Sequence, residues 1–198
     1  MKHSGDIIRC LTILLLLLGL SSPVIAQTNI LIVYHSETGN TKSLAEAVAK
    51  GAKSIDDVNV KLISVDEAEE DHLLRADAII VGSPVYNANV TPEISSFIAS
   101  WPFEGQPLKN KVGAAFVTAG GMSAGEEIVQ MNILQSMLIF GMVIAGGPDW
   151  TQPFGASAIT GEGAYYQENS DDIDKHFLEK GAALGSRVAE LAVKLHGK

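Results

Sequence analysis

The sequence contains a single cysteine, Cys10, among its 198 residues. This cysteine lies in a basic and then apolar N-terminal segment, so residues 27–198 contain none. No disulfide can form within residues 27–198, and no thiolate chemistry is available there.

Basic residues are also scarce. The sequence contains 14 Lys and Arg and 23 Asp and Glu, which gives a formal net charge of −9. An acidic surface argues against nucleic-acid and anionic-lipid partners, and it suits solubility or docking to a basic patch on another protein. The histidines after residue 26 are scattered along the sequence and form no ligand set, so we expect no metal site. They are His35, His72, His176 and His196.

The N-terminal segment has the pattern of a secretory signal peptide. Lys2 and Arg9 form its basic part, residues 11–20 are mainly apolar, and small residues precede a cleavage site after Ala26. We therefore expect export, with the periplasm as the destination, and a single domain over residues 27–198. An uncleaved membrane anchor is the alternative, but the apolar core is about half of the ~20 residues that a spanning helix needs. After cleavage we expect no stable membrane insertion.

Apolar runs alternate with helical patterns along residues 27–198, which predicts an α/β fold. Strands that are apolar throughout and separated by helices indicate a parallel sheet covered on both faces, in which ligands bind at the carboxyl ends of the strands. We expect a doubly wound, five-stranded sheet in the order 2-1-3-4-5. The expected strands are 29–34, 58–65, 77–82, 111–117 and 142–145, the last resuming at 154–159. The expected helices are 44–55, 66–75, one that opens at 91–94 with Thr91 as its N-cap, 126–140 and 173–195.

A polar loop, Ser36–Thr41, follows the first expected strand and precedes a helix. It combines three hydroxyls, a glycine and free backbone N–H groups at a helix N-terminus, which together favour binding of a phosphate. It lacks the lysine of a Walker A motif and the paired glycines of a Gly-x-Gly-x-x-Gly clamp. We therefore expect a single phosphate monoester as the ligand of this loop.

Two more loops are expected at the same edge of the sheet. Residues 83–89 follow the third strand, and residues 118–125 follow the fourth. Because the carboxyl ends of parallel strands meet at one edge, these loops lie where they can flank a flat ring attached to the phosphate.

The three loops carry a resemblance to a known family. Ser-x-Thr-Gly-Asn-Thr at Ser36–Thr41 resembles the FMN phosphate loop of flavodoxins, and Gly82-Ser83-Pro84 resembles their second flavin loop. Thr118-Ala119-Gly120-Gly121 resembles the third. This third loop, together with Gly155-Ala156-Ser157, looks closest to the NAD(P)H:quinone oxidoreductases related to tryptophan-repressor-binding protein. The resemblance spans residues 29–195 and implies a flavodoxin-like fold.

The resemblance implies FMN as the cofactor. The first loop would hold its phosphate, and the second and third loops would line the isoalloxazine ring, with Tyr86 as the aromatic candidate for contact with it. No acid or base is implied, and the catalytic residues are unknown. The implied cofactor-binding residues are Ser36, Glu37, Thr38, Gly39, Asn40, Thr41, Ser83, Pro84, Val85, Tyr86, Asn87, Ala88, Thr118, Ala119, Gly120 and Gly121.

The sequence departs from the family pattern at two positions. Ser123 stands where the quinone oxidoreductases carry a histidine, so a role for that histidine cannot be transferred. Ala88 stands where many members have a glycine whose peptide turns toward the flavin. Because alanine disfavours positive φ, we expect this turn to be weakened, which favours two-electron chemistry.

The resemblance implies an FMN-dependent oxidoreductase that passes electrons from NAD(P)H to a quinone or a similar acceptor, and the signal-peptide pattern of residues 1–26 adds the expectation that it is exported. An exported protein would meet little NAD(P)H, which favours the alternative of a flavodoxin-type carrier between a protein donor and a protein acceptor. A third alternative is a binding module that has lost its flavin. The quinone oxidoreductases resembled here are dimers or tetramers and classical flavodoxins are monomers, so the oligomeric state stays open.

Overall fold

The computed structural model describes residues 27–165 and 173–197. The expected signal peptide, residues 1–26, lies outside the described residues. Within them, no helix is both long enough and apolar enough to cross a bilayer.

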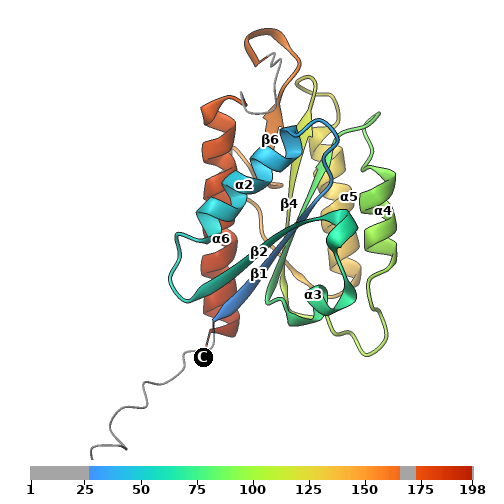
Figure 1. Cartoon of the computed structure of the whole chain (residues 1–198), viewed down its shortest axis with the longest axis vertical. Helices are drawn as coiled ribbons and strands as arrows, with labels where there is room; N and C mark the ends of the chain where they lie inside the picture. Colours follow the sequence, from blue (N-terminus) through green and yellow to red (C-terminus); the bar gives the residue numbers. More distant parts are fainter. Residues whose placement is uncertain (1–26, 166–172, 198) are drawn as a thin grey trace, which may run out of the picture.

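One parallel sheet forms the centre of the fold, with helices on both faces (Figure 1). Its main path has the order β2-β1-β3-β4-β5, which confirms the doubly wound topology expected from the sequence. The strands are β1 (Thr28–Tyr34), β2 (Val58–Ser64), β3 (Ala78–Pro84), β4 (Val112–Ala119), β5 (Val143–Ile144) and β6 (Ala156–Ile159).

The last strand is interrupted, as the sequence suggested. β5 pairs with Val112 and Gly113 near the start of β4, and β6 pairs with the far end of β4, from Phe116 to Ala119. Both pairings are parallel, so β6 resumes the edge that β5 begins.

The helices are α2 (Asn40–Ala52), α3 (Glu70–Arg75), α4 (Pro92–Ala99), α5 (Glu126–Ile139) and α6 (Lys175–His196), with 3₁₀ turns at Val65–Glu67 and Gly163–Tyr165. The single helix expected over residues 66–75 is therefore two short ones. The break falls at Ala68 and Glu69, whose backbone is extended. The expected cap of α4 is present, because Thr91 Oγ1 accepts a hydrogen bond from Ile94 N and Pro92 occupies the first turn.

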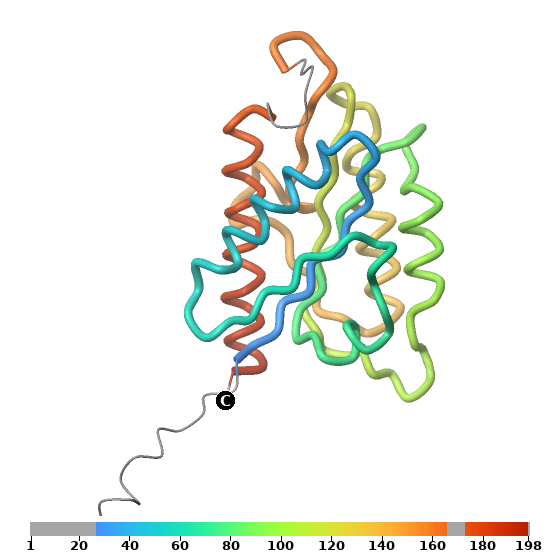
Figure 2. Tube along the Cα trace, viewed as in Figure 1, coloured from blue at the N-terminus to red at the C-terminus, as the bar shows by residue number. Residues whose placement is uncertain are grey.

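Alternate residues of each central strand point to opposite faces and bury into two separate cores. In β1, Ile30 and Ile32 pack toward α2 and α6, whereas Leu31 and Val33 pack toward the face that α3, α4 and α5 cover. Figures 1 and 2 show this layering, with α2 and α6 side by side. Gly185 permits their close approach, because a Cβ built there would lie 1.9 Å from Val48 O.

Candidate functional site

The first loop turns sharply between β1 and α2. Gly39, the N-cap of α2, has φ 93°, a left-handed conformation that glycine adopts at little cost. Ser36 Oγ accepts a hydrogen bond from Gly39 N at 3.1 Å, and Asn40 Nδ2 donates to Thr38 Oγ1 at 3.3 Å. The loop is thus held by its own hydroxyls, with its backbone curled around the start of the helix.

Polar groups at the start of α2 lack protein partners. Among the described residues, the amides of Asn40, Thr41 and Lys42 donate to no acceptor, and Asn40 Oδ1 is buried without a hydrogen bond. Lys42 points to solvent and lies 4.0 Å from Glu46. Neutral donors at the positive end of a 13-residue helix fit a phosphate monoester, the ligand that we expect for this loop.

Two contacts join the first loop to its neighbours. Thr41 Oγ1 and Thr118 Oγ1 lie 2.7 Å apart and are buried, which ties the start of α2 to the end of β4. His35 Nδ1 lies 3.0 Å from Thr91 Oγ1 and 3.3 Å from Glu93 Oε2, which ties the end of β1 to the start of α4.

Tyr86 of the second loop lies beside Glu37 of the first. Partial burial raises the pKa of the Tyr86 phenol above 10.0, and a hydrogen bond to the Glu37 carboxylate and its charge raise it further. Tyr86 remains 39 % exposed, so its side chain is accessible at the rim where the first two loops meet.

The second loop is a tight hairpin turn. Tyr86 N donates to Asn89 O at 3.1 Å, and Asn89 N donates to Tyr86 O at 3.0 Å. Asn87 and Ala88 have φ values of 52° and 60°, the left-handed pair that a type I′ turn requires. Ala88 thus adopts positive φ although alanine disfavours it, because the turn imposes this backbone. The weakened turn of its peptide toward the flavin and the two-electron chemistry stay predictions.

Some predicted site residues are buried beneath the loops. Ser83 is fully buried, and its hydroxyl donates to Pro84 O and accepts from Thr91 N. Val85 packs against both cores, and its amide donates to Thr118 O at 2.8 Å. The side chain of Ser83 and the backbone of Val85 therefore support the loop from within.

Two carboxylates hold the third loop, and neither is among the residues expected at the site. Glu126 accepts from Ser123 N and Ala124 N at 2.8 and 2.9 Å, and Glu162 accepts from Met122 N at 2.6 Å. The Ser-x-x-Glu spacing of a capping box could have pointed to Glu126. Glu162 is 40 residues away from Met122 in sequence, and no local signal identifies it.

The third loop is packed on one side and open on the other. A Cβ built on Gly125, where φ is 106°, would lie 2.6 Å from Ala88 Cβ, so the second and third loops pack directly together here. A Cβ built on Gly120 would meet nothing within 4 Å. The exposed backbone at Gly120 thus leaves room for a flat ring to approach.

All three loops therefore come together at the carboxyl edge of the sheet. Open grooves of about 510 and 700 Å³ lie elsewhere, between α4 and α5 and between α2 and α6, and neither contains a residue of these loops. The edge is a candidate site because of its donors and loop contacts. Among the described residues, no three His, Cys, Asp or Glu side chains are grouped to hold a metal ion.

Sequence comparison places the chain among flavin proteins. The profile of the NADPH-dependent FMN reductase family matches residues 67–156. A flavodoxin from Aquifex aeolicus is 33% identical over 180 residues, covering 85% of this chain and 90% of that protein. An NAD(P)H dehydrogenase (quinone) from Acidovorax ebreus is 31% identical over 204 residues, covering 86% of this chain and 100% of that protein.

Solved structures have the same fold. A WrbA-like flavodoxin from Agrobacterium tumefaciens superposes with a TM-score of 0.70 at 24% identity, covering 85% of this chain and 99% of that chain. An archaeal flavodoxin gives a TM-score of 0.63 at 25% identity, covering 83% of this chain and 99% of that chain. With this fold and these relatives, the chain belongs to the flavodoxin-like superfamily, and FMN is its indicated cofactor.

Proposed function

We propose that the protein is an FMN-dependent oxidoreductase that passes electrons from NAD(P)H to a quinone or a similar acceptor. The observation that carries this proposal is the match to the NAD(P)H dehydrogenase (quinone) of Acidovorax ebreus, which extends over 100% of that protein. When bound, FMN supplies the hydride and electron chemistry, and the protein supplies binding, orientation and exclusion of water.

The first loop is proposed to hold the FMN phosphate. The unpartnered amides of Asn40 and Thr41 and the hydroxyls of Ser36 and Thr38 are its donors. Thr41 also bridges to Thr118, so the same helix start that meets the phosphate is fixed to the third loop. The contact thereby fixes the first loop relative to the third.

The second and third loops are proposed to flank the ring. Tyr86 would supply an accessible aromatic side chain, and the backbone at Gly120 would supply the open surface that a ring needs. Gly121 has Glu162 close to it, since a Cβ built there would lie 2.8 Å from Glu162 Oε2. We assign no proton transfer to any side chain, because hydride transfer to a flavin needs none from these residues.

A flavodoxin-type electron carrier is the second candidate. Two observations favour it: the flavodoxin of Aquifex aeolicus is 33% identical, and the net charge of −9 suits docking to a basic protein partner. In this case protein donors and acceptors replace NAD(P)H and the quinone.

Steady-state oxidation of NADH and NADPH by the purified FMN-bound protein, with and without a soluble quinone, separates the two candidates. Quinone-dependent turnover supports the oxidoreductase. Reduction only by a protein donor supports the carrier. A colourless protein that cannot be reconstituted with FMN would contradict both and favour a binding module. Thr38→Val, in the first loop, should bind FMN more weakly, whereas Thr151→Val, on an exposed loop outside the site, should bind it as the wild type does.

We also propose that the protein is exported with cleavage after Ala26, on the strength of the basic, apolar and small-residue pattern of residues 1–26. Mass spectrometry of the protein from fractionated cells tests this directly. A periplasmic species beginning at Gln27 is expected, and a cytoplasmic species that retains Met1 would contradict the proposal.

A further inference from the structure

A polar pocket lies beside β2, apart from the three loops. It has a volume of about 500 Å³ and is lined by the first halves of β1 and β2 and by α3. Figure 1 shows α3 next to these two strands. Asn29 lines the pocket near the start of β1, whereas Ser36 follows the end of that strand, roughly 20 Å away at the usual rise of a strand. The pocket is therefore separate from the proposed flavin site.

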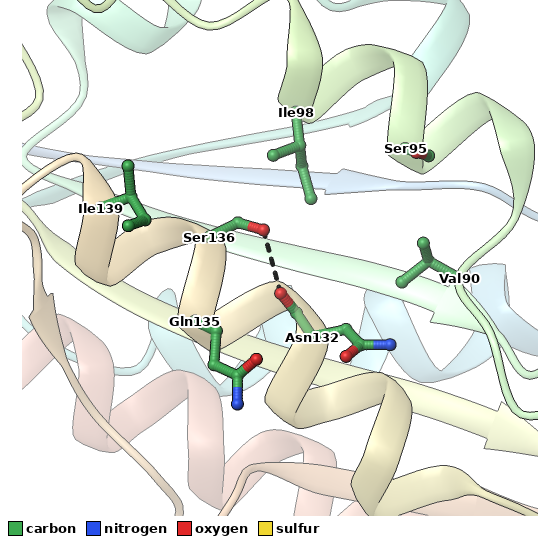
Figure 3. A pocket seen from close by; sticks show the side chains of 7 residues that line it. All are labelled: Val90, Ser95, Ile98, Asn132, Gln135, Ser136 and Ile139. Carbon is green, nitrogen blue, oxygen red and sulfur yellow. Dashed lines mark hydrogen bonds between the residues drawn. The ribbon is translucent and has the colours of Figure 1, made fainter.

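This pocket is charged, unlike the groove between α4 and α5. Figure 3 shows that groove, whose seven lining residues include no Asp, Glu, Lys, Arg or His. The pocket beside β2 is instead lined by Lys61, Asp71, His72 and Arg75. With His72 neutral, this lining carries one surplus positive charge in a chain whose net charge is −9. A concave site with such a surplus attracts a small anion.

The hydrogen bonds of His72 fix the tautomer of its ring. Nδ1 accepts a hydrogen bond from Glu69 N at 3.1 Å, as part of the capping box that begins α3. A backbone amide only donates, so Nδ1 carries no proton, and the single proton of the neutral ring is on Nε2. His72 Nε2 is therefore a hydrogen-bond donor.

Lys61 brings a second donor to the same point. Its Nζ lies 2.5 Å from His72 Nε2, and an ammonium group donates three hydrogen bonds but accepts none. Neither nitrogen can satisfy the other. Within residues 27–165 and 173–197, no Asp or Glu forms an ion pair with Lys61. A negatively charged acceptor in front of the two nitrogens would satisfy both at once, through charge-assisted hydrogen bonds.

The acidic residue of the pocket already has a partner. Both carboxylate oxygens of Asp71 lie within 3.0 Å of Arg75 Nε, so this aspartate is held by the next turn of α3 and away from Lys61. The pair engages only Nε of the guanidinium among the described contacts, which leaves the donors of its two terminal nitrogens for a ligand.

We propose that this pocket binds the carboxylate group of a small polar molecule. A carboxylate has two acceptor oxygens and one negative charge, which match the donors of Lys61 and His72 and the single surplus positive charge. The flexible stem of Lys61 lets its ammonium move back as an oxygen enters. The proposal concerns a site outside the flavin edge and does not rest on the proposed function.

Two asparagines extend the site toward the rest of the ligand. Asn29 and Asn59 are paired in register across β1 and β2, and Asn59 Nδ2 donates to Asn29 Oδ1 at 3.1 Å. Both residues line the pocket. Their remaining amide groups can donate to and accept from hydroxyl or carboxyl groups on the ligand, so a polar molecule fits better than an aliphatic acid.

The test is a nuclear magnetic resonance titration of the FMN-bound protein with succinate, using sodium chloride at matched ionic strength as the control. FMN then occupies its own site. We expect saturable shifts of the His72 ring nitrogens and of the amides near Lys61 and His72, with a dissociation constant on the order of 1 mM. If the protein proves not to bind FMN, the same titration without FMN still reports on the pocket, because the signals of His72 and of Thr41 are separate.

Two variants remove one donor each. Lys61→Met keeps an unbranched stem without the charge, and His72→Asn keeps an acceptor for Glu69 N but has no group in place of Nε2. Each should raise the dissociation constant for succinate about tenfold or more, because a charge-assisted hydrogen bond is lost. Lys194→Met is the matched control, since Lys194 is exposed on α6 outside the pocket, and it should bind succinate as the wild type does.

Three results would overturn the proposal or part of it. Shifts no larger with succinate than with sodium chloride would show that the pocket binds no carboxylate. An unchanged affinity in Lys61→Met would show the same of the donor pair, and this variant should fold because Lys61 is exposed, which far-ultraviolet circular dichroism checks. Tighter binding of inorganic phosphate than of succinate would overturn the carboxylate as the group that is recognised.

Discussion

The side-chain oxygens of Thr41 and Thr118 lie 2.7 Å apart in the interior and link the first turn of α2 to the end of β4. Both residues are buried, so neither hydroxyl can exchange its partner for bulk water. This single contact couples the loop that fits a phosphate to the loop that leaves room for a ring.

Thr41→Val should destabilise the protein by about 1–3 kcal/mol, because it leaves the buried Thr118 hydroxyl without its partner. Thr118→Val should have a similar effect. The double variant Thr41→Val/Thr118→Val should cost less than the sum of the two, and urea denaturation of the three variants measures this coupling. Additive single effects would show that the two hydroxyls do not interact.

Gly125→Ala should destabilise the protein by more than the ~1 kcal/mol that a left-handed backbone costs an alanine. At Gly125 the new Cβ would also lie 2.8 Å from Ala88 Cα, so the second loop must move. Gly105→Ala is the matched control, since its φ is 75° and a Cβ there meets nothing within 4 Å. The two unfolding free energies should differ clearly, and equal losses would mean that the contact between the second and third loops is unimportant.

Tyr86 should titrate above 10.0, as followed by the phenolate absorbance difference between the wild type and Tyr86→Phe. The folded state binds the phenolic proton of Tyr86 more tightly than the unfolded state does. The resulting contribution to the free energy of unfolding is complete below pH 10 and is lost as the pH rises through the raised pKa. Glu37→Gln should lower the pKa of Tyr86 only in part, because burial is the largest cause. A full return to the ordinary value would instead make Glu37 the dominant cause.

Glu162→Ala should loosen the third loop, because it removes the acceptor for Met122 N. Hydrogen exchange followed by mass spectrometry should show faster exchange in the peptide that contains Met122. Glu104→Ala, which alters an exposed carboxylate away from the site, should leave that peptide unchanged. Unchanged protection in Glu162→Ala would mean that Glu126 alone orders the loop.

The sheet and the position of the first loop, between β1 and α2, could be predicted because their signals are local. Ile30–Val33 and Ile79–Val81 are apolar at every position, which is typical of a short strand buried on both faces. The residues of the first loop are contiguous, and the helix follows them directly. The break at Ala68 was missed because both of its halves are acidic and helical in composition.

The contacts that assemble the three loops could not be predicted in the same way. Glu162 and Met122 are 40 residues apart, and Thr41 and Thr118 are 77 apart, so they meet only after β4 and β6 are placed. At Ala88, the residue's own backbone preference was outweighed by the two hydrogen bonds that close the hairpin turn. Local preference predicts such a position poorly when a turn fixes the backbone.

The most direct test of the assigned site compares binding of FMN and of riboflavin, which lacks the phosphate, to the apoprotein by fluorescence titration. If Ser36–Thr41 hold the phosphate, each charge-assisted hydrogen bond is worth about 1.5–3 kcal/mol, so riboflavin should bind at least about tenfold more weakly for each bond lost. Thr38→Val should weaken FMN binding and leave riboflavin binding unchanged. Equal affinities for FMN and riboflavin in the wild type would contradict the assignment of the phosphate to this loop.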